Sequence, residues 1–210
     1  MFLIKKTNET DFFRKGKPVN SMALFPIVPT FNGQCFYETI ARNIAVINKY
    51  FNFRESIKNN IGKYLSLKQR SWVLFTYPML LHREFVGFRN FHVSISYLKE
   101  TFNTLWEKEP ELLNETVYSR FRDNKNNVSH WVFNYWQYAS GAFLQHRASF
   151  GKSIRLSDDT VLNICKTVSR HKCNVLCIND TEQIRDYCQV KKTLLTCFDK
   201  ILPNKSKYEL

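Results

Sequence analysis

The sequence has 210 residues, of which 44% are hydrophobic and 15% aromatic, and it contains no low-complexity tract. This composition excludes a disordered chain and favours one packed domain or a large part of one. The 31 Lys and Arg against 18 Asp and Glu give a formal net charge of +13. Anionic partners are therefore expected: nucleotides, anionic polymers, nucleic acid or acidic lipid headgroups.

The first 34 residues predict little regular structure. Residues 1–6 suit a short strand, and Gly16, Pro18 and two further prolines favour an extended loop over the rest of 1–34. Apolar residues then recur at helical spacing and predict three helices, at 35–51, at 53–67 and at 71–80, the last ending near Pro78.

The middle of the chain is predicted as a loop followed by two helices. Residues 85–94 show little period and predict the loop, and a helix from Leu98 should stop near Pro110. Residues 128–139 form the clearest amphipathic pattern, with N-cap candidates in Asn124–Asn127. Its aromatic residues are expected in the core rather than on a sugar-stacking platform: Trp131, Tyr135 and Trp136.

The last third predicts a loop at Gly151, a helix over 161–168 opened by Ser157 or Asp158, the strand 175–178, and a helix over 182–202. The fold class is therefore mainly α with a few strands. A single strand is not stable by itself, and few partners are visible. The sequence is thus expected to be part of a larger α/β domain.

Six cysteines lack the paired spacing of a zinc site, so we expect reduced thiols in a cytoplasmic protein. No run approaches the ~20 apolar residues of a membrane span. The first residues, MFLIKK, are too short an apolar run for a signal peptide. The basic residues are scattered, so nucleic acid is not expected as a partner.

Isolated polar residues are the candidates for chemistry, because no phosphate loop or other short catalytic motif is present. His92 lies in an irregular loop, where it is a surface residue or a proton-transfer group. Arg120 and Arg122 flank Phe121 and are either solvated or a clamp for phosphate oxygens. Asp180 follows the strand and either caps the next helix or serves a metal or a hydroxyl nucleophile. Together these groups suit phosphoryl transfer.

Five segments in order resemble the C-terminal half of the Stealth family over nearly the whole chain: DFFRKGKPV, GFRNFHVSI, SRFRDNKNNVSHWVFNYWQYASGAF, CINDT and FDKILPNKSKYEL. Stealth proteins transfer a sugar 1-phosphate from a nucleotide sugar to a hydroxyl of an acceptor glycan, many of them in capsular or exopolysaccharide synthesis. The resemblance implies that His92, Arg122 and Asp180 are catalytic and that Arg120 and Asn179 contact the substrate. It also implies Mg²⁺ or Mn²⁺ held by Asp180.

The family's conserved regions divide the chain at the same places as the predicted helices and strands. Residues 1–34 are extended, 35–156 are helical and carry the family's third conserved region, and 157–210 form a helix-strand-helix unit with the fourth. Two departures stand out: Ser119 replaces a histidine, and the upstream Asn-Asp-Asp motif and nucleotide-binding region are absent. A missing N-terminal half or a partner chain is therefore expected.

The setting of capsule synthesis and the basic charge add an expected peripheral contact with the inner face of the membrane. Two alternatives remain: a non-catalytic remnant or acceptor-binding module for an anionic polymer, and, less favoured, a nucleic-acid-binding protein.

Overall fold

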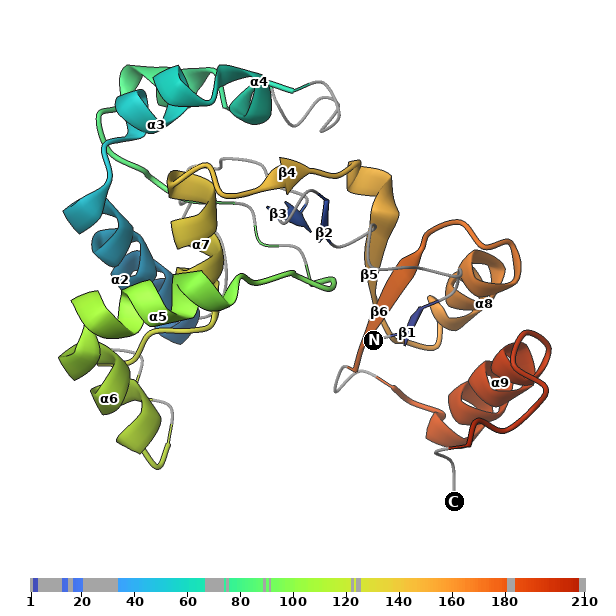
Figure 1. Cartoon of the computed structure of the whole chain (residues 1–210). Coiled ribbons are helices and arrows are strands. Elements are labelled where there is room, and N and C mark those ends of the chain that lie inside the picture. The colour runs from blue at the N-terminus through green and yellow to red at the C-terminus, as the bar shows by residue number, and fades with distance from the viewer. Residues whose placement is uncertain are drawn as a thin grey trace. The chain divides into compact units, whose positions relative to one another are not determined.

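The structure is a computed structural model that describes residues 2–3, 13–14, 17–20, 34–66, 74, 76–88, 90, 92–121, 123, 126–180 and 184–207. The chain divides into two compact units. Unit 1 comprises Met1–Asn8, Phe91–Ser94 and Ser149–Leu210, and unit 2 comprises Glu9–Asn90 and Ile95–Ala148. Helices dominate the described residues and the strands are few and short, so the predicted fold class is confirmed (Figure 1).

Unit 2 is a cluster of helices around a buried helix, α7. All nine residues of α7 are buried, and α2 and α5 pack against it. Besides the short 3₁₀ helix Pro78–Leu81, the described helices of this unit are α2 (Gln34–Tyr50), α3 (Phe53–Asn59), α4 (Ile61–Tyr64), α5 (Lys99–Lys108), α6 (Pro110–Tyr118) and α7 (Trp131–Ala139).

Stacked aromatic rings fill the core of unit 2. The ring centroids of Phe102 and Phe133 lie 4.0 Å apart, and those of Phe88 and Tyr135 lie 4.6 Å apart. The Tyr135 hydroxyl donates a 2.7 Å hydrogen bond to Asn90 Oδ1, which satisfies the polar end of a fully buried ring. Trp131 and Trp136 are also buried, so the prediction that these aromatic residues belong to the core is confirmed.

Two buried amides tie unit 2 together. Gln137 on α7 accepts from the backbone N–H of Leu98 at 2.8 Å and donates to the carbonyl of Ser96 at 3.0 Å. Asn43 on α2 donates to Ser129 Oγ at 2.7 Å and accepts from the Ser129 N–H at 3.1 Å. These bonds fix the residues that lead into α5 and α7, because a buried amide left unpaired would be costly.

Several predicted helix boundaries in unit 2 are wrong. The helix predicted over 53–67 breaks at Asn60, which ends α3 and begins α4. Pro78 begins a 3₁₀ helix instead of ending a helix, and part of the predicted 71–80 segment lies outside the described residues. The predicted stop near Pro110 is confirmed, since α5 ends at Lys108, but Pro110 also begins α6, a helix that the sequence did not predict.

Helix α7 begins at Trp131, three residues later than predicted. His130 occupies the N-cap position without a side-chain cap bond, so the predicted caps at Asn124–Asn127 are wrong. The extended loop predicted over 1–34 is also wrong in part. Strands β2 (Phe13–Arg14) and β3 (Lys17–Asn20) form an antiparallel pair, and β3 pairs in parallel with β4 (Leu144–Gln145).

Unit 1 is built on a three-stranded sheet in the order β1-β6-β5. Strand β5 (Gly151–Arg155), helix α8 (Val161–Ser169) and strand β6 (Val175–Asn179) form a parallel β-α-β unit, and β1 (Phe2–Leu3) pairs antiparallel with β6. The loop predicted at Gly151 is therefore wrong, because Gly151 begins a strand. The strand predicted over 175–178 is confirmed as β6, and it has two partners within this chain.

The described helices of unit 1 cover one face of this sheet (Figure 1). Leu176 and Ile154 pack there against Ile164 and Val168 of α8. Helix α9 (Tyr187–Asp199) packs beside α8 and is shorter than the predicted 182–202, with Asp186 as its N-cap.

The five cysteines described are free thiols, as predicted: Cys165, Cys173, Cys177, Cys188 and Cys197. Among the described residues, none of the helices has the length and apolar content that a membrane crossing requires.

Candidate functional site

The carboxyl ends of the parallel strands in unit 1 meet beside a pocket of about 520 Å³. Leu156 follows β5 and Asp180 follows β6, and both line this pocket. Asp180 therefore lies where open α/β sheets bind their ligands, at the end of a strand whose other side chains are buried or half-buried. The predicted location of Asp180 at a strand end is confirmed.

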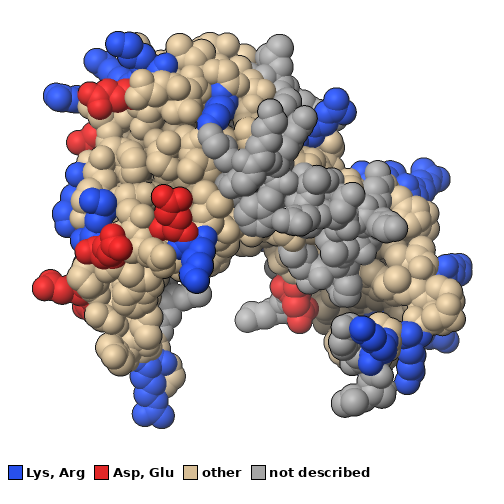
Figure 2. Space-filling view, in the orientation of Figure 1, with Lys and Arg blue, Asp and Glu red and all other residues tan. Residues whose placement is uncertain are grey.

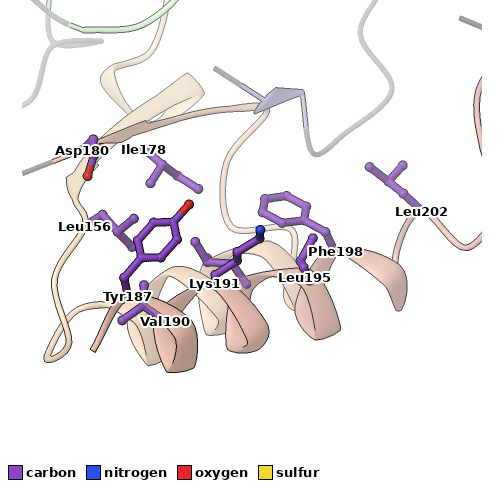
Figure 3. A pocket seen from close by; sticks show the side chains of 10 residues that line it. Leu156, Ile178, Asp180, Tyr187, Val190, Lys191, Leu195, Phe198 and Leu202 are labelled. Atoms are coloured by element: carbon purple, nitrogen blue, oxygen red, sulfur yellow. The ribbon is translucent and has the colours of Figure 1, made fainter. Parts of the chain in front are cut away.

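Helix α9 forms the opposite wall of the pocket (Figure 3). Tyr187, Lys191 and Leu195 follow one another at one turn of spacing and line it, and all three are exposed. Ile178 and Phe198 add to a lining that is mostly apolar. Asp180 and Lys191 are the charged groups among the lining residues, so the pocket combines an apolar wall with one anion and one cation.

Asn179 faces away from the helices, on the opposite face of the sheet from Ile178. Its Nδ2 donates to Ser153 Oγ at 3.2 Å, and its Oδ1 accepts from Cys177 Sγ at 3.2 Å. The three side chains form a half-buried to exposed polar strip close to the carboxyl ends of β5 and β6. The predicted substrate contact by Asn179 stays a prediction.

His92 belongs to the same unit but to the other end of the strands. Its neighbour Val93 packs over Gly151, the first residue of β5, while Asn179 pairs with Arg155 at the last. The first and last residues of β5 are four positions apart, which is about 13 Å along the strand at 3.3 Å per residue. The exposed His92 side chain and Asp180 thus share unit 1, at opposite ends of one sheet.

Replacing Gly151 with alanine should displace the His92 loop. A Cβ on Gly151 would lie 2.5 Å from Val93 Cγ1 and 2.9 Å from Val93 Cβ. Because a β-branched side chain has little freedom to move aside, we expect a loss of about 1–3 kcal/mol in the free energy of unfolding of unit 1. The free energy of unfolding of unit 1 is measured from the urea dependence of amide exchange at β5.

Gly62 is the matched control for this substitution, because a Cβ there meets nothing within 4 Å. Gly62→Ala should not destabilise the protein, and Val93→Gly combined with Gly151→Ala should restore part of the loss. A Gly151→Ala protein as stable as the wild type would show that Val93 does not pack closely there.

Of the two candidate arginines, Arg120 is among the described residues. Arg120 lies in unit 2, just after α6, with its guanidinium 5.4 Å from the centroid of the exposed Phe121 ring. It follows the C-terminal end of that helix. Arg122 lies outside the described residues, and its predicted catalytic role stays a prediction.

Ser119, which stands where the family has a histidine, has a local structural role. It is the C-cap residue of α6, and its hydroxyl donates to the carbonyl of Glu115 at 2.7 Å. This bond satisfies one of the carbonyls that the end of a helix leaves unpaired.

Asp158 lies in the turn after β5, whereas the sequence pattern assigned it to the start of α8. Its carboxylate accepts the backbone N–H groups of Arg185 and Asp186 at 3.0 and 3.1 Å, and these bonds lower the pKa of the Asp158 carboxyl. Of the two residues predicted to open α8, Ser157 does so and Asp158 does not. Ser157 and Thr160 bond one another there. No pattern in the sequence joins Asp158 to a loop 27 residues away.

The described residues do not assemble a metal site by themselves. They contain no group of three or more His, Cys, Asp or Glu side chains that could hold a metal ion. Asp180 would supply one carboxylate, whereas Mg²⁺ is commonly bound by one or two carboxylates together with substrate phosphates and water. The predicted metal at Asp180 therefore stays a prediction.

Lys and Arg side chains are scattered over both units on the face that Figure 2 shows. This distribution agrees with the scattered pattern in the sequence. It gives a generally basic surface that attracts anionic ligands but does not identify a binding site for any particular one.

Comparison with known proteins finds relatives that align with the whole chain, although no family model matches it. The chain is 32% identical over 208 residues to a capsular polysaccharide phosphotransferase, WcwK, of Streptococcus pneumoniae, covering 99% of this chain and 61% of the relative. It is 31% identical over 212 residues to the receptor polysaccharide phosphotransferase WefC of Streptococcus oralis, covering 100% of this chain and 62% of the relative.

A third relative, the exopolysaccharide phosphotransferase cps2G of Lactiplantibacillus plantarum, is 26% identical over 211 residues, covering 100% of this chain and 61% of the relative. The chain thus spans about three fifths of the length of the curated relatives that it matches. Similarity along the whole chain confirms the resemblance to the Stealth family first seen in five short segments, because the relatives are polysaccharide phosphotransferases.

Proposed function

We propose that this chain is the C-terminal part of an enzyme that transfers a sugar 1-phosphate from a nucleotide sugar to a hydroxyl of an acceptor glycan, in the synthesis of a capsular or surface polysaccharide. The observation that carries the proposal is the whole-chain similarity to polysaccharide phosphotransferases. The pocket beside Asp180, at the carboxyl ends of parallel strands, supports it.

The reaction requires one bond to form and one to break at phosphorus. The acceptor oxygen attacks the phosphorus that carries the sugar, and the bond from that phosphorus to the bridging oxygen breaks. The nucleoside monophosphate leaves with the bridging oxygen, and the acceptor proton passes to a base. Positioning and stabilisation of negative charge provide most of the catalysis in such transfers.

The roles of the side chains follow from their chemistry. His92 would be the base, because its imidazole nitrogen can accept a proton from a hydroxyl. Arg122, with Arg120 beside it, would bind phosphate oxygens through the planar guanidinium. Asn179 would donate to the donor substrate, and Asp180, at the opposite end of the sheet from His92, would orient the donor. Asp180 would also be the protein ligand of a bound Mg²⁺ or Mn²⁺ ion, which would neutralise negative charge on the donor phosphates.

Release of nucleoside monophosphate in the presence of an acceptor glycan tests this function. The chain should be assayed alone and fused behind the segment of pneumococcal WcwK that it does not match, with Mg²⁺ or Mn²⁺ and a panel of nucleotide sugars; intact WcwK is the positive control. We expect release by the fusion and none by the chain alone. Robust release by the chain alone would contradict the proposal that the chain is one part of the enzyme.

A second function, binding of an anionic acceptor polymer without catalysis, is favoured by the net charge of +13. It predicts salt-sensitive binding of the polymer and no release of nucleoside monophosphate by the fusion. The same assay, run beside a binding measurement, therefore separates the two functions.

A further inference from the structure

The turn between β5 and α8 bonds the backbone of the residues that lead into α9. Asp158 lies in this turn, and its two carboxylate oxygens each accept one backbone N–H, from Arg185 at Oδ2 and from Asp186 at Oδ1. A carboxylate that bonds two consecutive amides restrains both the position and the direction of the backbone that carries them.

A second carboxylate continues this connection into helix α9. Asp186 Oδ1 accepts the backbone N–H of Gln189 at 2.9 Å and so caps the first turn of the helix. Tyr187, the first residue of α9, lines the pocket together with Asp180. Two carboxylates in series thus connect the end of β5 to the wall that faces Asp180.

No other described role accounts for Asp158. The start of α8 is closed by Ser157 and Thr160, whose side chains each accept the backbone N–H of the other. The two amides that bond Asp158 belong to the segment between β6 and α9. The hydrogen bonds of the Asp158 side chain therefore stabilise the edge of the pocket rather than the start of α8.

We propose that Asp158 is a positioning residue for Asp180: it anchors residues 185–186 and thereby sets Asp180 against the α9 wall of the pocket. Asp158 does not touch the substrate. Its effect on transfer rests on the proposed function, while its effect on the loop and on Asp180 does not. The backbone donors also keep the pKa of Asp158 below its ordinary range, so the anchor is ionised at neutral pH.

Asp158→Asn is the test, with Asp159→Asn as the matched control that removes the same charge from the adjacent, exposed residue. Asparagine keeps the shape but loses one acceptor and the charge. We expect amide exchange at Arg185 and Asp186 to rise by about 10- to 100-fold, the equivalent of one lost hydrogen bond to a charged group. The ¹³C resonance of the Asp180 carboxyl should shift as well. Neither change is expected in the control.

Three results would overturn the proposal: unchanged exchange at residues 185 and 186, faster exchange spread evenly over β5, α8 and β6, or an Asp180 resonance that does not respond. In the active fusion, Asp158→Asn should lower kcat more than it raises KM, and Asp158→Glu should restore part of the loss. Unchanged kinetics in an active fusion would also overturn it. If the fusion releases no nucleoside monophosphate, the proposed function fails, and the exchange and carbon measurements still decide the role of Asp158.

Discussion

Replacing Leu176 with alanine is expected to lower the free energy of unfolding of unit 1 by about 2–5 kcal/mol. Leu176 is fully buried in β6, the central strand of the sheet, and belongs to the core that α8 and α9 cover. Its removal leaves a cavity bounded by both helices and by Ile154. Because β6 also ends in the residue that precedes Asp180, this loss should weaken the candidate site.

The sequence provides separate probes for the two units. Amide exchange at β5 and β6 follows unit 1, while Trp fluorescence follows unit 2, since all the tryptophans fall within it: Trp72, Trp106, Trp131 and Trp136. Leu176→Ala should speed exchange in unit 1. Leu105→Ala, at a fully buried position of unit 2, is the control and should shift the fluorescence transition. A Leu176→Ala protein within about 0.5 kcal/mol of the wild type would contradict the assigned core.

Asp180→Asn is expected to reduce the rate of transfer in the fusion by about 10²- to 10³-fold, the scale found when one group aimed at the reacting atoms is removed. The substitution keeps the size of the side chain and removes its negative charge. Asp180 lines the pocket from an exposed position, so the fold should be unaffected. The measurement is kcat for release of nucleoside monophosphate.

Asp199→Asn is the control for this experiment, because Asp199 is an exposed aspartate at the other end of α9 in the same unit. It should leave kcat within about 2-fold of the wild type, as expected for a surface change away from the site. A wild-type kcat for Asp180→Asn would show that Asp180 takes no part in the reaction and only lines the pocket.

Elements with a strong local pattern could be predicted from the sequence. Ile40, Ile44 and Ile47 are buried at helical spacing, and α2 follows the predicted bounds closely. Strand β6 was predicted from its apolar run, and the position of Asp180 after it followed from the same pattern. In each case one buried face specifies both the element and its orientation.

Elements specified by distant partners could not be predicted. Strand β5 buries only Ile154 on the helix-covered face, so its sequence carries no alternation, and it is a strand because β6 pairs with it. Asp158 was assigned to the wrong helix for the same reason, since its partners are far along the chain. The roles of His92 and Asp180 came from the family resemblance, because neither lies in a catalytic motif that spacing alone defines.

The ³¹P NMR spectrum of the transfer products tests the central claim most directly. The fusion, a nucleotide sugar and the acceptor glycan should yield one phosphorus in a nucleoside monophosphate and the other in a phosphodiester between sugar and glycan. This distribution requires attack at the phosphorus that carries the sugar. If the fusion instead released a nucleoside diphosphate and left no phosphorus on the glycan, the chain would belong to an ordinary glycosyl transfer, and the account given for Asp180 and His92 would be contradicted.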